Sequence, residues 1–233
     1  MKILAFDSTA ITASVAVTED EKLIAEITLN NGNTHSQTLL PMAESLFRML
    51  DITADDIDLF AVSEGPGSFT GVRIGAATVK GLAFGRESQC IGVSTLEALA
   101  YNLRAHKGIV CPVMNARRSQ VYTAIFESDG ETLTRLSDDM AISADELDER
   151  LACLGKEVRL CGDGIEVAIE NFTKTKPIKV PEELTYQSGY SVAMVALSKY
   201  REGVRGNDAS LVPTYLRLSQ AERERLEKEQ RGE

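Results

Sequence analysis

The sequence runs Glu64-Gly65-Pro66-Gly67-Ser68-Phe69-Thr70-Gly71-Val72-Arg73-Ile74-Gly75 directly after the apolar segment 58–62. Four glycines and a proline in these twelve residues exclude a strand interior, because proline cannot donate to the ladder and glycine weakens it. Small and apolar residues then continue to Phe84, as is typical of a helix entered at Ser68 or Thr70. The stretch therefore predicts a strand, a tight glycine turn and a helix.

The glycine turn has two interpretations. Because glycine lacks a Cβ atom, Gly65 and Gly67 allow a sharp turn and a close approach to a ligand, and the free N–H groups of the following helix can bind an anion. Alternatively, Ser68 or Thr70 only caps the helix. The Lys-Ser/Thr pair of a phosphate loop and the spacing of a dinucleotide-binding motif are both missing. These absences favour the turn-and-cap interpretation.

Composition excludes several classes of protein. The chain has 233 residues, of which 43% are hydrophobic, enough for two small domains or one large one. A formal net charge of −10 argues against a freestanding nucleic-acid binder, because affinity for phosphate needs clustered Lys and Arg. The four cysteines form no C-x-x-C pair, and His35 and His106 are too far apart for a metal-binding pair. We therefore expect neither a disulfide framework nor a catalytic metal site.

The distribution of apolar residues indicates where the protein works. The first apolar run, Ile3 to Phe6, lacks the length and the cleavage site of a signal peptide. No apolar stretch reaches the length that spans a membrane. We expect a cytoplasmic protein without a membrane partner.

The first half of the chain has the predicted order βββαβαβα. Three strands at 3–6, 14–18 and 23–29 form a meander. Helices at 34–50, 69–84 and 95–104 follow, with strands at 58–62 and 89–93 between them. Asp7, followed by Ser8 and Thr9, ends the first strand. It could hold a magnesium ion or a phosphate, or only form a side-chain-to-backbone turn. A phosphate turn would favour glycine where Thr9 and Ala10 stand.

Two of these helices have more apolar or small surface than one core face needs. In helix 34–50 the apolar residues repeat at helical spacing, and Pro41 marks either a start or a bend. In helix 69–84 the stripe Gly71, Gly75 and Thr78 would let a second helix approach closely, in this chain or in a partner. Both helices are therefore candidates for a docking surface.

The second half repeats the order of strands followed by helices. Strands are predicted at 109–114, 120–126, 132–136 and 158–161, and helices at 143–151 and 188–200. This repetition indicates two α/β lobes that face a cleft. We expect a first lobe at 1–107, a second lobe at 108–218, and a charged solvated helix or tail at 219–233.

Four segments together resemble the TsaB family of bacterial tRNA threonylcarbamoyladenosine (t6A) biosynthesis proteins. They are Ile3-Leu4-Ala5-Phe6-Asp7-Ser8-Thr9, the glycine stretch 65–75, Met114-Asn115-Ala116-Arg117-Arg118-Ser119-Gln120-Val121-Tyr122 and Pro213-Thr214-Tyr215-Leu216-Arg217. The resemblance covers nearly the whole chain, and the glycine motif is its most specific part. It implies the α/β, two-lobed fold of the actin, Hsp70 and sugar-kinase superfamily, with a mixed sheet and flanking helices in each lobe.

The resemblance also implies a role. Such proteins are non-catalytic scaffold subunits that dimerise with a catalytic paralogue, TsaD, which binds metal and ATP and transfers a threonylcarbamoyl group to the tRNA adenosine beside the anticodon. A small ATPase, TsaE, joins the complex, and tRNA is reached only through it. By this resemblance the chain has no catalytic residue, no metal and no tightly bound cofactor, and ATP and metal are expected on the partner subunits.

Two sets of site residues follow. The partner interface is predicted at Leu39, Ala43, Leu46, Leu50, Phe69, Gly71, Val72, Gly75, Ala76 and Val79. Residues close to a nucleotide are predicted at Asp7, Ser8, Gly67, Ser68 and Arg73. The alternative is a stand-alone ATP-dependent phosphotransferase or peptidase-like hydrolase of the same superfamily, with Asp7 and the glycine turn as its site. Without its partner, the chain could form a homodimer through the same helices.

Overall fold

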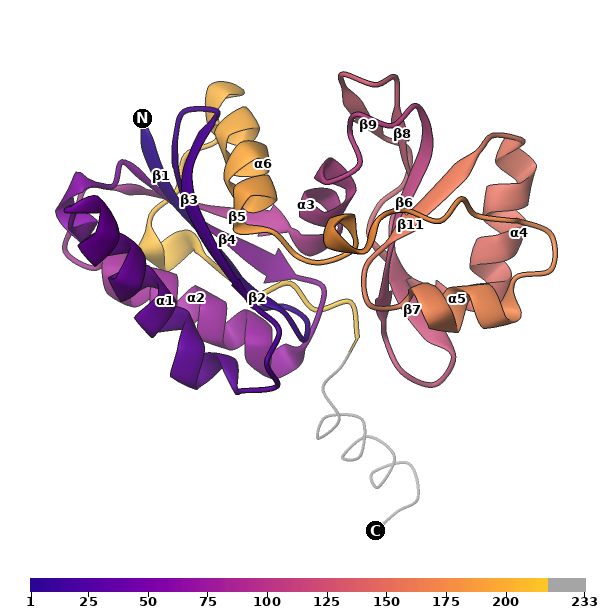
Figure 1. Cartoon of the computed structure of the whole chain (residues 1–233), viewed down its shortest axis with the longest axis horizontal. Coiled ribbons are helices and arrows are strands. Elements are labelled where there is room, and N and C mark those ends of the chain that lie inside the picture. Colours follow the sequence, from indigo (N-terminus) through magenta and orange to yellow (C-terminus); the bar gives the residue numbers. More distant parts are fainter. Residues whose placement is uncertain (218–233) are drawn as a thin grey trace, which may run out of the picture.

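The computed structural model describes residues 1–217, and they form two α/β lobes side by side (Figure 1). The first lobe contains a five-stranded mixed sheet in the order β3-β2-β1-β4-β5. β1 is antiparallel to β2 and parallel to β4, which is in turn parallel to β5. The strands are β1 (Lys2–Asp7), β2 (Ala13–Glu19), β3 (Lys22–Leu29), β4 (Leu59–Gly65) and β5 (Gln89–Ser94). The meander of β1, β2 and β3 is thus as predicted.

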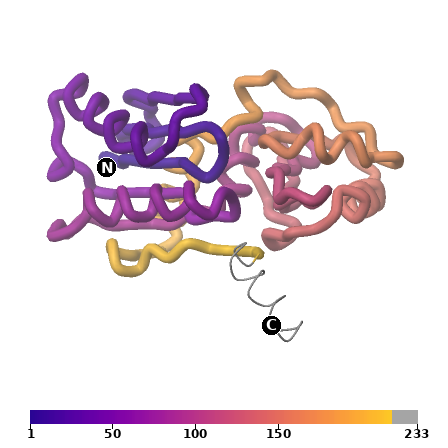
Figure 2. Tube along the Cα trace, turned by 90° about the horizontal axis from the view of Figure 1, so that it is seen from below, coloured from indigo at the N-terminus to yellow at the C-terminus, as the bar shows by residue number. Residues whose placement is uncertain are grey.

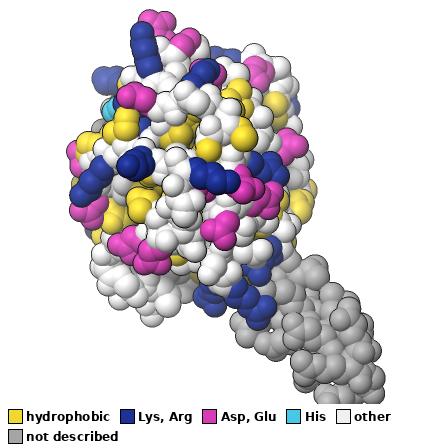
Figure 3. Space-filling model, turned by 90° about the vertical axis from the view of Figure 1, so that its right-hand side faces the viewer, with side chains coloured by type: hydrophobic (Ala, Val, Ile, Leu, Met, Phe, Trp, Pro, Cys, Tyr) yellow, Lys and Arg dark blue, Asp and Glu magenta, His cyan; other side chains and the backbone are white. Residues whose placement is uncertain are grey.

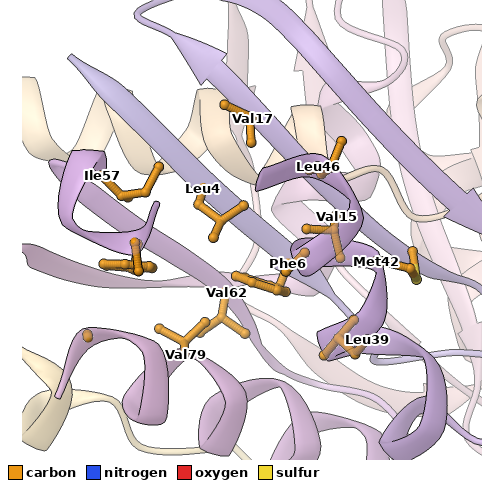
Figure 4. Packing of buried hydrophobic residues seen from close by; sticks show 14 of the residues in the cluster. Leu4, Phe6, Val15, Val17, Leu39, Met42, Leu46, Ile57, Val62 and Val79 are labelled. Atoms are coloured by element: carbon orange, nitrogen blue, oxygen red, sulfur yellow. The ribbon is translucent and has the colours of Figure 1, made fainter. Parts of the chain in front are cut away.

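Helices cover both faces of the first sheet. α1 (His35–Leu50) and α2 (Phe69–Ala83) pack on one face, where Leu4 and Phe6 of β1 point (Figure 4). α6 (Gly189–Arg201) packs on the other face, against Ile3 and Ala5. Because neighbouring residues of a strand point to opposite faces, burial of both faces explains the unbroken apolar run of β1. Pro41 lies inside α1, not at its start.

The second lobe contains a six-stranded mixed sheet in the order β10-β7-β6-β8-β9, and β11 pairs in parallel with β6. α4 and α5 pack on one face of this sheet, and α3 packs on the face toward the first lobe. The strands are β6 (Gly108–Asn115), β7 (Gln120–Thr123), β8 (Phe126–Ser128), β9 (Leu133–Arg135), β10 (Met140–Ser143) and β11 (Val158–Cys161), and the helices are α3 (Thr95–Tyr101), α4 (Ala144–Leu154) and α5 (Ile165–Asn171). Short 3₁₀ turns complete the chain: η1 (Ala54–Asp56), η2 (Glu182–Leu184) and η3 (Asp208–Ser210).

The chain returns to the first lobe near its end. Ser188 caps α6 by accepting a hydrogen bond from the Ser191 N–H, and its hydroxyl donates to Glu26 of β3 at 2.9 Å. Gly189 lies so close to β2 that a Cβ atom there would be 2.7 Å from the Ala16 nitrogen. The segment from 188 onward therefore packs on the first sheet, which differs from the predicted second lobe of 108–218. The second sheet begins with β6 at Gly108, and α3, which precedes the predicted boundary at 107, packs on that second sheet.

Several local predictions differ from the structure. The strand predicted at 120–126 is divided into β7 and β8, which pair with different parts of β6. The helix predicted at 95–104 ends at Tyr101. The charged segment predicted at 219–233 lies outside the described residues. Within 1–217, none of the helices is long and apolar enough to cross a membrane.

Candidate functional site

A pocket of about 720 Å³ lies between the lobes. Its first-lobe wall consists of the turn after β1 and of the glycine turn that leads into α2. Its second-lobe wall consists of the β6–β7 turn and of Asp163 after β11. The chain after α6 supplies a further wall, and the lining ranges are 9–11, 66–70, 114–117 and 214–217, together with Tyr122 and Asp163. This volume is typical of small-ligand sites.

The glycine turn joins two parts of the first lobe. Ser68 caps α2, because its hydroxyl accepts a hydrogen bond from the Gly71 N–H at 3.2 Å. The Ser68 N–H donates to the Thr9 carbonyl at 2.7 Å. A Cβ atom on Gly67 would lie 2.5 Å from that same carbonyl oxygen, so only glycine fits there. The turn-and-cap interpretation therefore describes the geometry, and it also explains why this turn lies directly against the turn after β1.

The small residues of α2 have a different neighbour from the expected helix. A Cβ atom on Gly71 would lie 2.0 Å from the Ser8 carbonyl oxygen, and one on Gly75 would lie 2.7 Å from Ser8 Oγ. Ser8 Oγ in turn donates to the Gly71 carbonyl at 2.9 Å. The prediction that this stripe admits a second helix is wrong, because the turn after β1 occupies the space above it.

Asp7 is fully buried, and all of its contacts are internal. Its carboxylate accepts hydrogen bonds from the Thr9 N–H at 2.9 Å, the Thr9 hydroxyl at 2.7 Å and the Ser63 hydroxyl at 2.5 Å. Burial raises the pKa of this carboxyl above its usual value, and the bonds from Ser63 and Thr9 oppose part of that effect. Asp7 and Ser8 are thus engaged in joining β1 to β4 and α2, and neither lines the pocket. Of the residues predicted near a nucleotide, Gly67 and Ser68 line it.

The second-lobe wall is formed by a turn with an uncommon backbone. Arg117, Arg118 and Ser119 have φ values of 63°, 56° and 55°, in the left-handed region that residues other than glycine rarely adopt. Asn115 supports the turn, since its side-chain oxygen accepts from the Arg117 N–H at 2.8 Å. Asp163 accepts from the Asn115 N–H at 3.2 Å, and its burial raises the pKa of its carboxyl. Arg117 and Asp163 therefore place one cation and one acid in the same wall.

Most of the predicted interface residues face the core of this chain. Leu39, Ala43 and Leu46 of α1 pack beneath the first sheet. In α2, Gly71, Val72, Gly75, Ala76 and Val79 are buried, whereas Phe69 is partly exposed, as is Leu50 in α1. The prediction that these buried side chains contact a partner is wrong. The apolar residues at helical spacing form the face of each helix that packs on the sheet of the same chain. A partner could only meet the opposite face of the two helices.

Tyr215 and Arg217 are site residues that the pattern analysis missed. Arg73, predicted near a nucleotide, instead donates from Nε to the Tyr215 hydroxyl at 2.8 Å and lies 3.9 Å from the centre of the Phe69 ring. The Tyr215 ring stacks on Phe69 with centroids 4.5 Å apart. The segment 213–217 contributed to the family resemblance, but no periodicity or charge pattern indicated that it would return to the glycine turn.

The described residues offer no ready metal site. No group of three or more His, Cys, Asp and Glu side chains in 1–217 is placed to hold a metal ion. His35 contacts the Ala10 carbonyl through Nε2 at 2.6 Å, and its Nδ1 atom has no partner among these residues. The polar groups that could meet a ligand in the pocket include the N–H groups at the start of α2 and the side chains of Arg117, Asp163 and Arg217.

Known proteins are similar to this chain over almost its whole length. The family model of TsaD, tRNA N6-adenosine threonylcarbamoyltransferase, matches residues 22–225. The tRNA threonylcarbamoyladenosine biosynthesis protein TsaB of Bacillus subtilis is 31% identical over 97% of this chain and 99% of its own. TsaB of Escherichia coli is 30% identical over 93% of this chain and 95% of its own.

Among solved structures, YeaZ from Pseudomonas aeruginosa superposes with a TM-score of 0.80 at 24% identity, and the match covers 92% of this chain and 99% of that one. The fold class is confirmed as the two-lobed α/β fold of that structure, with a mixed sheet and flanking helices in each lobe. The extent and identity of the sequence matches establish the family: the chain belongs to the TsaB family of tRNA threonylcarbamoyladenosine biosynthesis proteins.

Proposed function

We propose that this chain is an accessory subunit in t6A formation and that it binds a catalytic paralogue, TsaD, through the outer face of α1 and α2. Family membership supports the pathway. The observation that carries the proposed docking is the group of exposed apolar and small side chains on the two helices. In this proposal the complex, and not this chain alone, holds the tRNA, in keeping with the formal charge of −10. The dimer would also help to recruit the ATPase TsaE.

The outer face contains Ala77 and Gly81 of α2 and Phe84 at the end of α2. The exposed Leu40 and Met49 lie on the two flanks of α1, whose own exposed ridge is formed by Pro41, Glu44 and Arg48. Leu40, Met49 and Phe84 are 43%, 65% and 75% exposed, and Ala77 and Gly81 are exposed and small. Exposed apolar side chains that lie close together can mark a protein–protein interaction site. The outer side of the second lobe instead mixes acidic, basic and scattered apolar side chains (Figure 3).

The end of β1 supports an accessory role. Asp7, the acid that a metal-dependent phosphotransferase would need at this position, is buried and already accepts three hydrogen bonds. The paralogue would supply the metal, the ATP and the transfer chemistry. This chain would supply a rigid first lobe on which the partner's helices rest.

The pocket between the lobes favours a second candidate, a stand-alone ATP-dependent phosphotransferase or a peptidase-like hydrolase. Its volume of about 720 Å³ would admit a nucleotide or a short peptide. The purified chain would then turn over ATP or a peptide without a partner. We expect no such turnover, because the described residues lining the pocket include one carboxylate, Asp163, and no histidine or cysteine.

The test of the docking proposal is Ala77→Glu. A charge at this exposed position would meet the partner's apolar surface, whereas in the free chain the introduced carboxylate would face solvent and could pair with Lys80. We expect normal folding, loss of co-elution with the paralogue in size-exclusion chromatography, and loss of t6A formation on a tRNA transcript in the reconstituted system.

The matched control is Ala152→Glu, the same change at an exposed position of α4 in the second lobe. It should retain both complex formation and t6A formation. If Ala77→Glu keeps the complex intact, the outer face of α1 and α2 is not the docking surface. If omission of the whole chain leaves t6A formation unchanged, the accessory role itself is wrong.

A further inference from the structure

The last described part of the chain, Leu211 to Arg217, passes from one lobe to the other and is called the C-terminal strap here. It leaves η3 beside β5 and begins at Leu211, which is 2% exposed in the core of the first lobe. From there it runs along α2 toward the second lobe (Figure 2). Its residues 214–217 line the pocket between the lobes.

The strap lies directly on the glycine turn. The Thr214 N–H donates to the Glu64 carbonyl at 2.7 Å. Gly65 has a φ of 118°, and a Cβ atom there would be only 2.3 Å from the Thr214 carbonyl oxygen. Because Gly65 has no Cβ atom, the turn leaves the space that Thr214 of the strap occupies.

Tyr215 fastens the strap to the start of α2. Its ring stacks on Phe69, with an angle of 28° between the ring planes, and its hydroxyl accepts the hydrogen bond from Arg73 Nε. The Arg73 guanidinium also lies over the Phe69 ring, 3.9 Å from its centre. Three side chains thus hold the strap at the first-lobe edge of the pocket.

At its far end the strap reaches the second lobe. Arg217 donates from Nη1 to the Ala116 carbonyl in the β6–β7 turn. Beyond Leu211 the strap has no buried side chain, and Val212 is 63% exposed. Segments with few buried contacts open locally, without unfolding of the domain, because little apolar surface is lost.

We propose that the C-terminal strap is a gate of the pocket between the lobes, with Leu211 as its fixed end and Tyr215 as its latch. In the closed state Tyr215 and Arg217 bridge the two walls and restrict entry. Release of the Tyr215 stack frees residues 212–217 and opens the pocket while both lobes stay folded. This gate concerns access to the pocket and goes beyond the proposed docking at the outer face of α1 and α2.

A thiol placed in the pocket wall tests the gate. The reporter is Ala116→Cys in a Cys153→Ser background, since Cys153 is the exposed native thiol and Cys90, Cys111 and Cys161 are buried. The measured quantity is the rate of labelling by a bulky maleimide. Tyr215→Ala should raise that rate by about tenfold or more, because local opening limits access in the parent protein. Tyr215→Phe keeps the stack, so its rate should rise less.

The control is Val212→Ala, an exposed position of the same strap, which should leave the rate unchanged. Peptide mapping of the buried Cys111 separates gating from unfolding in every variant. An unchanged labelling rate of the reporter thiol in Tyr215→Ala would overturn the proposal. A proportional rise at Cys111 would also overturn it, because the strap would then be part of the cooperative fold and not a separate gate.

Discussion

At the scale of single residues, Asp7 illustrates how neighbours decide the role of an acid. An aspartate at the end of the first strand can hold a metal ion or form a local turn, and sequence alone left both open. In the structure, Thr9 and Ser63 donate three hydrogen bonds to it. These donors lie two and fifty-six positions away in the sequence, so only the first contact could be expected from local pattern.

We predict that Asp7 matters for stability and not for chemistry. Asp7→Ala leaves a buried N–H group and two buried hydroxyls without their acceptor, which should lower the free energy of unfolding by about 3 kcal/mol. Asp7→Asn is isosteric and can keep these contacts, so it should cost less than about 1 kcal/mol. Urea unfolding monitored by circular dichroism measures both values.

The raised pKa of Asp7 predicts how the stability difference between Asp7→Asn and the parent protein changes with pH. Because the folded state raises the pKa of Asp7, the stability associated with this group is fully present below its ordinary pKa of 3.8 and is lost as the pH rises through the raised value. Asp7→Asn removes that component, so its deficit relative to the parent should be largest at acidic pH and shrink toward neutral pH. If Asp7→Asn folds normally yet abolishes t6A formation in the reconstituted system, the carboxylate has a chemical role and this interpretation is wrong.

At the scale of elements, α2 contains glycines in crowded surroundings and a glycine in open surroundings. Gly71 and Gly75 lie against Ser8, whereas a Cβ atom on Gly81 would meet nothing within 4 Å. A pattern of small residues indicates close approach, but it does not identify what approaches. The spacing correctly predicted a tight contact and wrongly predicted a helix as the neighbour.

We predict opposite effects of the same substitution within α2. Gly71→Ala forces its methyl group against the Ser8 backbone, which cannot move without disturbing β1, and should lower the free energy of unfolding by about 3 kcal/mol. Gly81→Ala has open space and gains helix propensity, so it should raise that free energy by up to about 1 kcal/mol. Denaturation midpoints of the two variants check this. Equal effects of both changes would show that Ser8 does not confine α2.

Sequence pattern predicted most elements, and its failures have physical causes. Strand β1 is a short unbroken apolar run and helix α1 has apolar residues at helical spacing, so the type and limits of both could be predicted within a few residues. The division of the strand predicted at 120–126 was missed. No local sequence pattern indicates that Ala124 and Ile125 separate two strands, which pair with different parts of β6. The return of α6 to the first sheet depends on contacts with β2 and β3, far away in the sequence. Tyr215 was missed for the same reason.

At the scale of the whole molecule, two lobes meet at a pocket whose walls come from five separate segments. α3 packs on the second sheet and also contacts α6, so it connects the cores of the two lobes. The C-terminal strap connects them again at the pocket. α1 and α2 cover the face of the first sheet opposite α6 (Figure 1), so docking on these helices would take place away from the contact between α3 and α6 and next to the strap, which is fastened to the first turn of α2.

We predict that the outer face of α1 and α2 also supports a homodimer in the absence of the paralogue. Leu40, Met49 and Phe84 remain exposed in the free chain, and apolar surface of this kind favours association. Light scattering should give a mass that rises toward the dimer with concentration. Ala77→Glu should yield a monomer at all concentrations, whereas Ala152→Glu should behave as the parent does. Added paralogue should convert the homodimer to a heterodimer, because both would use the same face. A homodimer that persists in Ala77→Glu, or one that binds the paralogue without dissociating, would place self-association on another surface.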